Sequence, residues 1–285
     1  MSTTRAAPNH DATSNGALRK ARLPRGVEIA YRIDGPPDAP VVLLAHGLLA
    51  DHSVWDAVAT RLAARFRVLR PDLRGHGASP APPPPYTLAQ LGEDLLALLD
   101  ELHIAQAHLV GSSMGGMLAQ PVAARHGKRL LSLTLATTAA EQLGAAAWQE
   151  RIDLVRHQGV KALADATLER WLTPAFRERA PEQAACLRAS MLRTSDDGYV
   201  GCASAVRDLD HLPLLAQIHV PTLVIAGAQD LATPPAQSLQ LQQGIAGARL
   251  VTLDAGHQAA FEQPEAFCEA WLAFIDKLPL AAAAS

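Results

Sequence analysis

A serine flanked by glycines is the clearest candidate for chemistry in this chain. The run Gly111-Ser112-Ser113-Met114-Gly115 fits the pattern G-x-S-x-G, and it follows an apolar segment and precedes a helical one. A tight strand-to-helix turn presents such a serine as a nucleophile, and the glycines let neighbouring backbone approach without a Cβ clash. We predict that Ser113 is the nucleophile. Ser112 is the competing serine, but it lacks a glycine two residues before it.

A serine hydroxyl is scarcely ionised at neutral pH, so it needs a base to take its proton. His257 is the candidate, because it follows the last predicted strand and comes after the serine and an acid in the chain. His46 and His76 lie in glycine-flanked loops near the carboxyl edge of the predicted sheet, where they can line the site without being the base. Four further histidines have polar neighbours and are expected to be solvated: His103, His108, His126 and His157.

The base needs a carboxylate that orients its ring and stabilises the imidazolium. We predict Asp230, which follows the strand-like segment 221–226 and precedes the turn Thr233-Pro234-Pro235. Asp254 is too close in sequence to the histidine to reach round it easily, and Glu141 is a weaker substitute. An aspartate beside such a turn can also be a turn former only.

The tetrahedral anion of an acyl transfer needs two backbone N–H donors. The amide of Met114, directly after the predicted nucleophile, supplies one. We expect the other in the loop His46-Gly47-Leu48, after the apolar segment 41–45, and assign it to Leu48. Together these residues predict acyl transfer to water, in which Ser113 attacks an ester or lactone carbonyl.

Strand-like and helical segments alternate, which favours a mostly parallel sheet with helices on both faces. Strands are predicted at 27–33, 41–45, 67–70, 107–110, 131–136, 221–226 and 249–253. Helices are predicted at 53–65, with Ser53 as N-cap, at 87–102, at 113–126 and after Pro264. The four prolines at 82–85 predict a stiff loop.

Between about 141 and 212 this alternation stops. Short amphipathic helices follow one another there, including 146–158, 160–172 and 182–193. We therefore predict a helical cap (141–212) inserted into one α/β core (21–140 and 213–278), after a disordered tail (1–20). The large apolar residues of the cap suit a cap core as well as a pocket, so none is predicted as a site residue: Trp148, Trp171, Phe176, Met191 and Tyr199.

The composition restricts the possible partners. The 285 residues are 49% hydrophobic with a formal net charge of −3, so they can fill a core and carry no electrostatic footprint for nucleic acid or an anionic membrane. Cys186, Cys202 and Cys268 show no C-x-x-C spacing, so neither a disulfide framework nor a metal site is indicated. Without a secretory or bilayer-spanning apolar run, we expect a cytoplasmic protein with a small-molecule substrate. The residues carry no signal for an oligomeric state.

Five stretches together resemble the α/β-hydrolase superfamily over about residues 24–278: 46–47, 72–79, 111–115, 227–230 and 256–257. Within it, the chain is similar to the 3-oxoadipate enol-lactonases. The similar stretches are GSSMGGMLAQ at 111–120, LERWLTPAFRERAPE at 168–182, VPTLVIAGAQDLATPP at 220–235 and FEQPEAF at 261–267. The resemblance implies an α/β-hydrolase fold with a helical cap. It also implies hydrolysis of a small enol-lactone in the breakdown of aromatic compounds, without a cofactor.

Two positions depart from the lactonase pattern. The lactonases usually carry Asn-Ser where this chain has His46-Gly47, which favours a general carboxylesterase with perhydrolase side activity. They tend to carry a basic residue where this chain has Glu141, although a carboxylate substrate needs a cation. Arg151, Arg156 or Arg193 in the cap can supply one, with plain surface solvation as the alternative for each.

Two further classes of protein share this fold. A ligand-sensing module with slow turnover remains open from the residues alone. Epoxide hydrolases and haloalkane dehalogenases need a carboxylate nucleophile, and the serine at position 113 rules against them.

Overall fold

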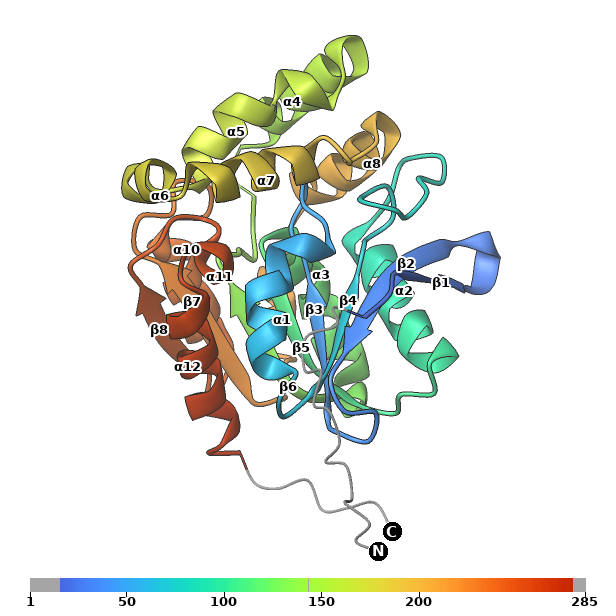
Figure 1. The fold of residues 1–285 in the computed structure, drawn as a ribbon, viewed down its shortest axis with the longest axis vertical. Coiled ribbons are helices and arrows are strands. Elements are labelled where there is room, and N and C mark those ends of the chain that lie inside the picture. Colours follow the sequence, from blue (N-terminus) through green and yellow to red (C-terminus); the bar gives the residue numbers. More distant parts are fainter. Residues whose placement is uncertain (1–15, 143, 279–285) are drawn as a thin grey trace, which may run out of the picture.

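The computed structural model describes residues 16–142 and 144–278, which form an eight-stranded sheet with helices on both faces (Figure 1). The strand order is β1-β2-β4-β3-β5-β6-β7-β8. From β4 to β8 all neighbouring strands are parallel, whereas β1 and β2 run antiparallel to their neighbours. The predicted mostly parallel sheet with helices on both faces is confirmed.

The central strands are short runs of buried residues, because helices cover both of their sides. Every residue of β3, β5 and β7 is buried, which is why these strands read as continuous apolar segments. The strands are β1 (Arg19–Arg22), β2 (Glu28–Asp34), β3 (Val41–Ala45), β4 (Arg67–Pro71), β5 (Ala107–Ser112), β6 (Leu130–Ala136), β7 (Thr222–Gly227) and β8 (Arg249–Leu253).

Helices α1 (Asp56–Leu62) and α12 (Pro264–Ile275) pack side by side on one face of the sheet, in front in Figure 1. Helices α2 (Leu88–Glu101) and α3 (Met114–His126) pack together behind it. The other helices of the core are α9 (Leu212–Leu215), α10 (Pro235–Gly244) and α11 (Ala259–Glu262). The 3-10 turns are η1 (Pro24–Gly26), η2 (His52–Trp55), η3 (Gly127–Arg129) and η4 (Val160–Ala162). Across residues 16–142 and 144–278, no helix combines the length and apolar character needed to cross a bilayer.

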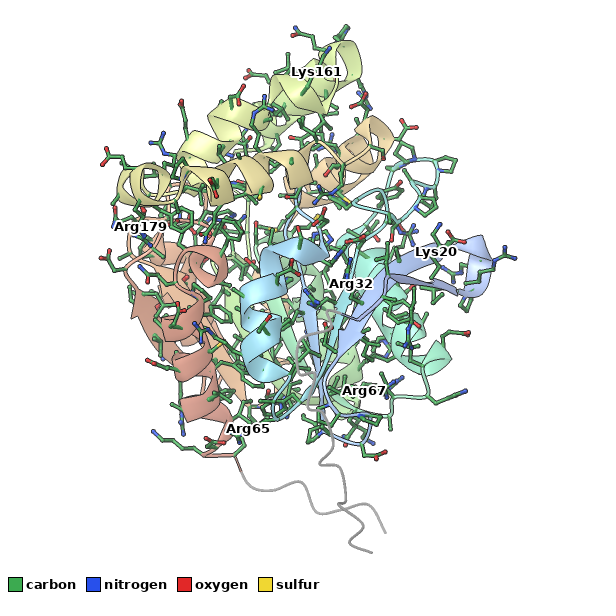
Figure 2. All side chains as sticks on the ribbon, in the orientation of Figure 1. Lys20, Arg32, Arg65, Arg67, Lys161 and Arg179 are labelled. Carbon is green, nitrogen blue, oxygen red and sulfur yellow. The ribbon has the colours of Figure 1, made fainter. Side chains whose placement is uncertain are left out.

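Five helices lie over the carboxyl ends of the strands, at the top of Figure 1. They are α4 (Ala145–Gln158), α5 (Ala164–Trp171), α6 (Pro174–Arg179), α7 (Pro181–Met191) and α8 (Asp196–Arg207). The chain enters and leaves this group side by side, because Glu141 and Asp210 form an antiparallel bridge. The labelled cations of Figure 2 are spread apart, with Lys161 at the tip of this group and Arg65 and Arg67 at the opposite end of the molecule.

The predicted tail and one helix start need correction. The tail was predicted over 1–20, of which 1–15 lie outside the described residues, but Arg19–Arg22 form β1 and pair with β2. This edge strand buries only one side chain, Ala21, so it shows no apolar alternation. The N-cap before α1 was predicted as Ser53, yet the capping side chain is Asp51, which accepts from the Ser53 amide. A side-chain oxygen of Asp51 caps η2, the 3-10 turn that directly precedes α1.

His108 was predicted to be solvated, and this is wrong. It lies in β5 with 7% of its surface exposed. Its ring packs edge-on against Phe66 and Trp271, at centroid distances of 6.0 and 5.7 Å, and Nδ1 lies 2.8 Å from the Ser132 hydroxyl. The two rings that enclose His108 come from distant parts of the chain, so its neighbours in sequence do not reveal its burial.

This buried histidine predicts a pH-dependent stability. Burial lowers the pKa of His108 to about 4, below the value of about 6.5 for an unfolded chain. The neutral ring is therefore favoured by folding, and that contribution is present above about pH 6.5 and is lost as the pH falls toward 4. In the wild-type protein, the free energy of unfolding in urea should fall between pH 7 and pH 5. In His108→Gln this fall should be smaller by about 2 kcal/mol. His126→Gln, on the exposed end of α3, is the control and should leave the difference unchanged; an unchanged difference in His108→Gln would contradict the prediction.

Candidate active site

Ser113 occupies a strained turn between β5 and α3. Its backbone has φ 52° and ψ −121°, a conformation that non-glycine residues rarely adopt. The turn is tight enough to demand glycine on both sides. A Cβ on Gly111 would lie 2.3 Å from the Gly115 carbonyl oxygen, and one on Gly115 would lie 2.2 Å from the carbonyl oxygen of Ala45. The motif therefore describes a steric requirement of this backbone.

The structure brings Ser113, His257 and Asp230 together in a hydrogen-bonded chain. His257 Nε2 lies 2.9 Å from Ser113 Oγ, and His257 Nδ1 lies 2.9 Å from Asp230 Oδ2. All three side chains are buried. They come from the ends of β5, β7 and β8, so the parallel sheet delivers them to one edge. This arrangement can move a proton from the serine hydroxyl to the imidazole while the carboxylate holds the ring.

The Asp230 carboxylate is fixed by its own turn. It accepts hydrogen bonds from the amides of Ala232 (2.7 Å) and Thr233 (2.9 Å) and from the Thr233 hydroxyl (2.7 Å). Burial opposes its ionisation, but the His257 imidazole and the Thr233 donors outweigh that effect and lower the pKa of Asp230. The turn that could have made Asp230 a mere turn former thus holds it as an anion beside the histidine.

The competing residues lie elsewhere. Asp254 pairs with the exposed side-chain amide of Gln229 at 2.8 Å, and Glu141 accepts from Gln240 Nε2 at 2.6 Å. Ser112 Oγ points to the Thr137 hydroxyl, 3.2 Å away. Within the described residues, neither carboxylate bonds to the His257 imidazole, and the Ser112 hydroxyl does not bond to it either.

The amides of Leu48 and Met114 are available to an oxyanion. Met114 is the first residue of α3, and the N–H groups of a first helical turn have no acceptor inside the helix. The Leu48 amide has no hydrogen-bond acceptor among the described residues. Both residues line the cavity that contains Ser113. Gly47 allows this approach, since a Cβ there would lie only 3.0 Å from the Cβ of Ser113.

His46 and His76 do not line the site, contrary to expectation. Both rings are fully buried behind the loop that carries Leu48, with centroids 5.2 Å apart. His46 Nε2 accepts from the Leu73 amide at 2.9 Å, and His76 Nε2 accepts from the Leu49 amide at 3.3 Å. Burial, and next the neighbouring His46, lower the pKa of His76 to about 3, so the ring stays neutral and can accept. The two rings join the Leu48 loop to the loop that follows β4.

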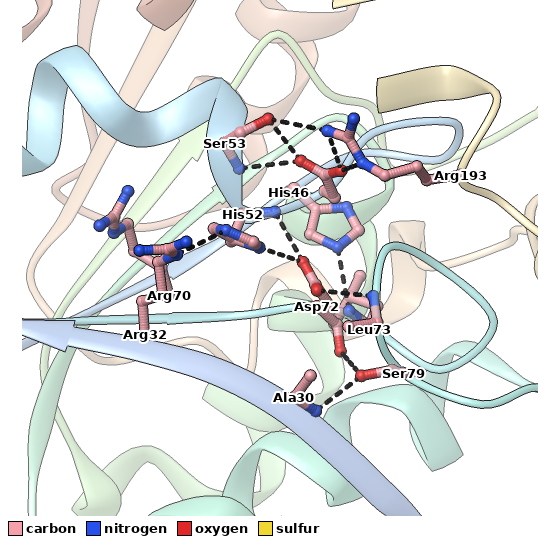
Figure 3. Close-up of polar contacts among 12 residues, drawn as sticks. Ala30, Arg32, His46, His52, Ser53, Arg70, Asp72, Leu73, Ser79 and Arg193 are labelled. Carbon is pink, nitrogen blue, oxygen red and sulfur yellow. Dashed lines mark hydrogen bonds and ion pairs between the residues drawn. The ribbon is translucent and has the colours of Figure 1, made fainter. Parts of the chain in front are cut away.

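A second layer of polar residues supports the same loops, and the sequence reasoning missed it (Figure 3). Asp72 accepts from the amide and Nδ1 of His52, at 2.8 and 2.7 Å, and from the Ala78 amide at 2.9 Å. Asp51 accepts from Arg193 Nε of the helical group at 2.6 Å. The possible ligand atoms of Asp51, His52 and Asp72 lie within 4.8 Å of one another. Their acceptors are already matched by protein donors, so we assign no metal to this cluster.

A cavity of about 170 Å³ opens between the helical group and Ser113. It is small beside the roughly 300–1,000 Å³ of common ligand pockets. Three of the large residues predicted as cap core or pocket line it, namely Trp148, Trp171 and Tyr199, whereas Phe176 and Met191 do not. The remaining lining includes Ser113, Met114, Met117, Leu48, Leu49, Gln142, Thr167, Thr233, His257 and two arginines.

Those two arginines, Arg151 and Arg170, are the only cationic side chains among the described lining residues. Neither guanidinium has a carboxylate within ion-pair distance in the described part of the chain. The Nε atom of Arg170 is buried without a hydrogen-bond partner. Burial, and then the neighbouring charge of Arg151, lower the pKa of Arg170. Two half-buried cations therefore face one small cavity without an anion between them.

Of the three cap cations considered from the sequence, only Arg151 faces this cavity. Arg156 pairs with Asp153 on the surface, and Arg193 pairs with Asp51. Arg170 was missed. It lies one helical turn after Thr167 in α5, so both residues are on the face that lines the cavity, but the sequence alone carries no signal for which face that is.

Comparisons with known proteins identify relatives that share this fold. A family model described as the alpha/beta hydrolase fold matches residues 40–264. The chain is 39% identical to 3-oxoadipate enol-lactonase 2 of Acinetobacter baylyi, over 85% of this chain and 90% of that protein. It is similar to the solved enol-lactonase of Burkholderia xenovorans LB400, with a TM-score of 0.88 and 42% identity over 91% of this chain and 100% of the other. A thermophilic esterase from Thermogutta terrifontis, solved with malate bound, has a TM-score of 0.86 and 29% identity over 92% and 99% of the two chains.

The geometry predicts which side chains the reaction requires. With a short aryl ester as substrate, Ser113→Ala or His257→Ala should lower kcat by at least about a thousandfold, and Asp230→Asn by about 10³- to 10⁴-fold. Ser112→Ala and Asp254→Asn are the matched controls, because each removes the same kind of group from a neighbouring position. Full activity in Ser113→Ala would refute the assignment.

Proposed function

The chain belongs to the α/β-hydrolase family, and on that premise we propose that it hydrolyses small lactones or esters that carry a carboxylate group. Its preferred substrate, in this proposal, is 3-oxoadipate enol-lactone or a close analogue. The observation that carries the substrate class is the cavity that Arg151 and Arg170 line together with Ser113. The names of the relatives from Acinetobacter baylyi and Burkholderia xenovorans support the same class.

The first half of the proposed reaction acylates Ser113. His257 Nε2 takes the hydroxyl proton as Ser113 Oγ attacks the lactone carbonyl, and Asp230 stabilises the imidazolium that forms. The amides of Leu48 and Met114 donate to the new oxyanion. Each such donor contributes roughly 3 kcal/mol to the transition state in comparable sites.

Collapse of this first anion opens the ring and completes the acylation, and hydrolysis of the acyl-serine then releases the acid. The C–O bond of the lactone breaks, and His257 gives its proton to the departing oxygen, which remains tethered to the acyl group. For an enol-lactone that oxygen becomes an enol and then a ketone. Water, deprotonated by His257, next attacks the acyl-serine, and collapse of the second tetrahedral anion returns Ser113. Every proton transfer in this route passes through His257, from Ser113 in acylation and from water in deacylation, and both oxyanion donors are amides of the chain, so the route requires no cofactor.

Binding of an anionic substrate follows from the electrostatics of the cavity. Burying a guanidinium without a partner is costly, and a carboxylate between Arg151 and Arg170 would offset both that cost and the repulsion between them. Arg151 is held in place by stacking on Trp148, with Cζ 5.0 Å from the ring centroid. The small volume restricts the acid to a short one. A cytoplasmic location, as expected from the sequence, and a role in the breakdown of aromatic compounds, as the enol-lactonase resemblance implies, complete the proposal.

The arginine pair predicts a charge-dependent loss of affinity. Arg170→Met should raise KM for the anionic enol-lactone by about 10- to 100-fold, because a charge-assisted hydrogen bond contributes roughly 1.5–3 kcal/mol. KM for a neutral aryl ester should change less than about threefold. Arg156→Met is the matched control, since Arg156 lies on α4 with Arg151 but pairs with Asp153 on the surface.

Two other outcomes would favour the rival functions. If the wild-type enzyme prefers neutral aryl esters, and Arg170→Met weakens both substrates equally, the protein is a general carboxylesterase. If the enol-lactone binds but turns over only slowly, without a partner protein to accelerate it, the sensing module is favoured.

A further inference from the structure

One buried carboxylate near the site has no part in the proposed reaction. Glu262, at the end of α11, is 4% exposed and follows His257 by five residues. Its Oε1 accepts from the Gly256 amide at 3.0 Å, and its Oε2 accepts from the Thr173 hydroxyl at 2.6 Å. The Thr173 amide lies 3.3 Å from Oε1. Through these bonds Glu262 connects two other segments, the histidine loop and the start of α6.

The same two segments touch at a second point. The His257 amide donates to the Trp171 carbonyl at 2.8 Å, and the Trp171 ring lies 5.5 Å from the imidazole, centroid to centroid. Gly256 sits between the two attachments. A Cβ there would lie 2.5 Å from the Trp171 carbonyl oxygen and 2.8 Å from Glu262 Oε1, so the close approach requires glycine.

We propose that Glu262 is a positioning residue for His257, which it holds by fastening the Gly256-His257 loop to the cap segment Trp171–Thr173. This inference rests on the proposed role of His257 as the base. Two hydrogen-bonded contacts, one on each side of Gly256, leave the loop little freedom to rotate the imidazole away from Ser113. Figure 1 shows the two elements involved, with α6 of the cap above α11 of the core.

The energetics favour a positioning role over a stabilising one. Burial raises the pKa of Glu262, and the Thr173 hydroxyl and the Gly256 amide only partly oppose this. A raised folded-state pKa means that the protonated group favours folding below the unfolded value and loses that contribution as the pH rises through the folded value. Burial therefore disfavours the ionised form, although it is the form that accepts from all of its donors.

The fastening also connects substrate binding to the base. Arg170 and Trp171 line the cavity, and Trp171 and Thr173 hold the histidine loop. A carboxylate bound by Arg170 therefore acts on a segment that is one residue away from a hydrogen bond to His257. It also follows that this part of the cap cannot lift from the core without disturbing the base.

The test uses a neutral aryl ester as substrate, so that the result does not depend on anion binding by Arg151 and Arg170. Glu262→Ala should lower kcat by about 10- to 100-fold with KM within about twofold, because a small misplacement of a catalytic group is enough for such a loss. Glu262→Gln, which keeps an acceptor for Gly256, should recover most of that loss. Thr173→Val should lose activity and Thr173→Ser should retain it. Glu265→Ala is the matched control, since Glu265 is exposed on α12 and pairs with Arg61.

Titration of active sites with a phosphonate separates positioning from folding. The rate of phosphonylation per folded molecule should fall in Glu262→Ala, with the melting temperature as the check on folding. If kcat per titrated site is unchanged and only the titrated fraction falls, Glu262 is purely structural and the proposal is overturned. Ser113→Ala distinguishes the two levels: an active Ser113→Ala refutes the proposed function, whereas an inactive Ser113→Ala beside a normal Glu262→Ala refutes this inference alone.

Discussion

The site depends on one strained backbone position. Holding Ser113 at positive φ costs on the order of 1–3 kcal/mol, so the surrounding structure must over-determine it. Its amide donates to the Ala136 carbonyl at 3.0 Å, and its carbonyl accepts from the Thr138 hydroxyl at 2.6 Å. The neighbouring strand β6 and the loop that follows it thus fix both the amide and the carbonyl of Ser113. Two further residues with positive φ, Leu49 and Thr137, lie in the loops next to it, so these loops share the strain of the site, whereas Arg25 and His103 have positive φ elsewhere.

Buried polar groups make this strain tolerable. An unpaired buried donor or acceptor is costly, and the loops around Ser113 bury several such groups. His46 accepts from the loop after β4, and Asp72 in that loop gathers donors from His52 and Ala78. The Leu49 amide bonds to His76, whereas the Leu48 amide beside it has no acceptor among the described residues and is free for an oxyanion. Preorganisation of this kind lets the donors act without reorganising as charge develops.

The sequence allowed the positions of the candidate site residues at the ends of the strands to be predicted, but not those of the cavity-lining residues in the cap. The reason is physical. Ser113, Asp230 and His257 each follow a buried strand, and parallel strands deliver their ends to one edge whatever the loops between them do. Arg170 has no such rule, because which face of α5 meets the cavity depends on how the cap docks. His108 was misplaced because its polar neighbours say nothing about the Phe66 and Trp271 rings that enclose it. Edge strand β1 lacked an apolar face to detect.

In this interpretation the cap segment 170–173 both binds the substrate and holds the loop of His257. Arg170 contributes the cation that suits an anionic substrate, Trp171 contributes a ring and a carbonyl beside His257, and Thr173 contributes a hydroxyl to the buried Glu262. The proposed nucleophile and oxyanion donors belong to the sheet edge and its loops. The proposed base contacts both the core, through Asp230, and the cap, through Trp171. Replacing this segment to change specificity would then also move the imidazole, so substrate choice and catalytic geometry cannot vary independently here.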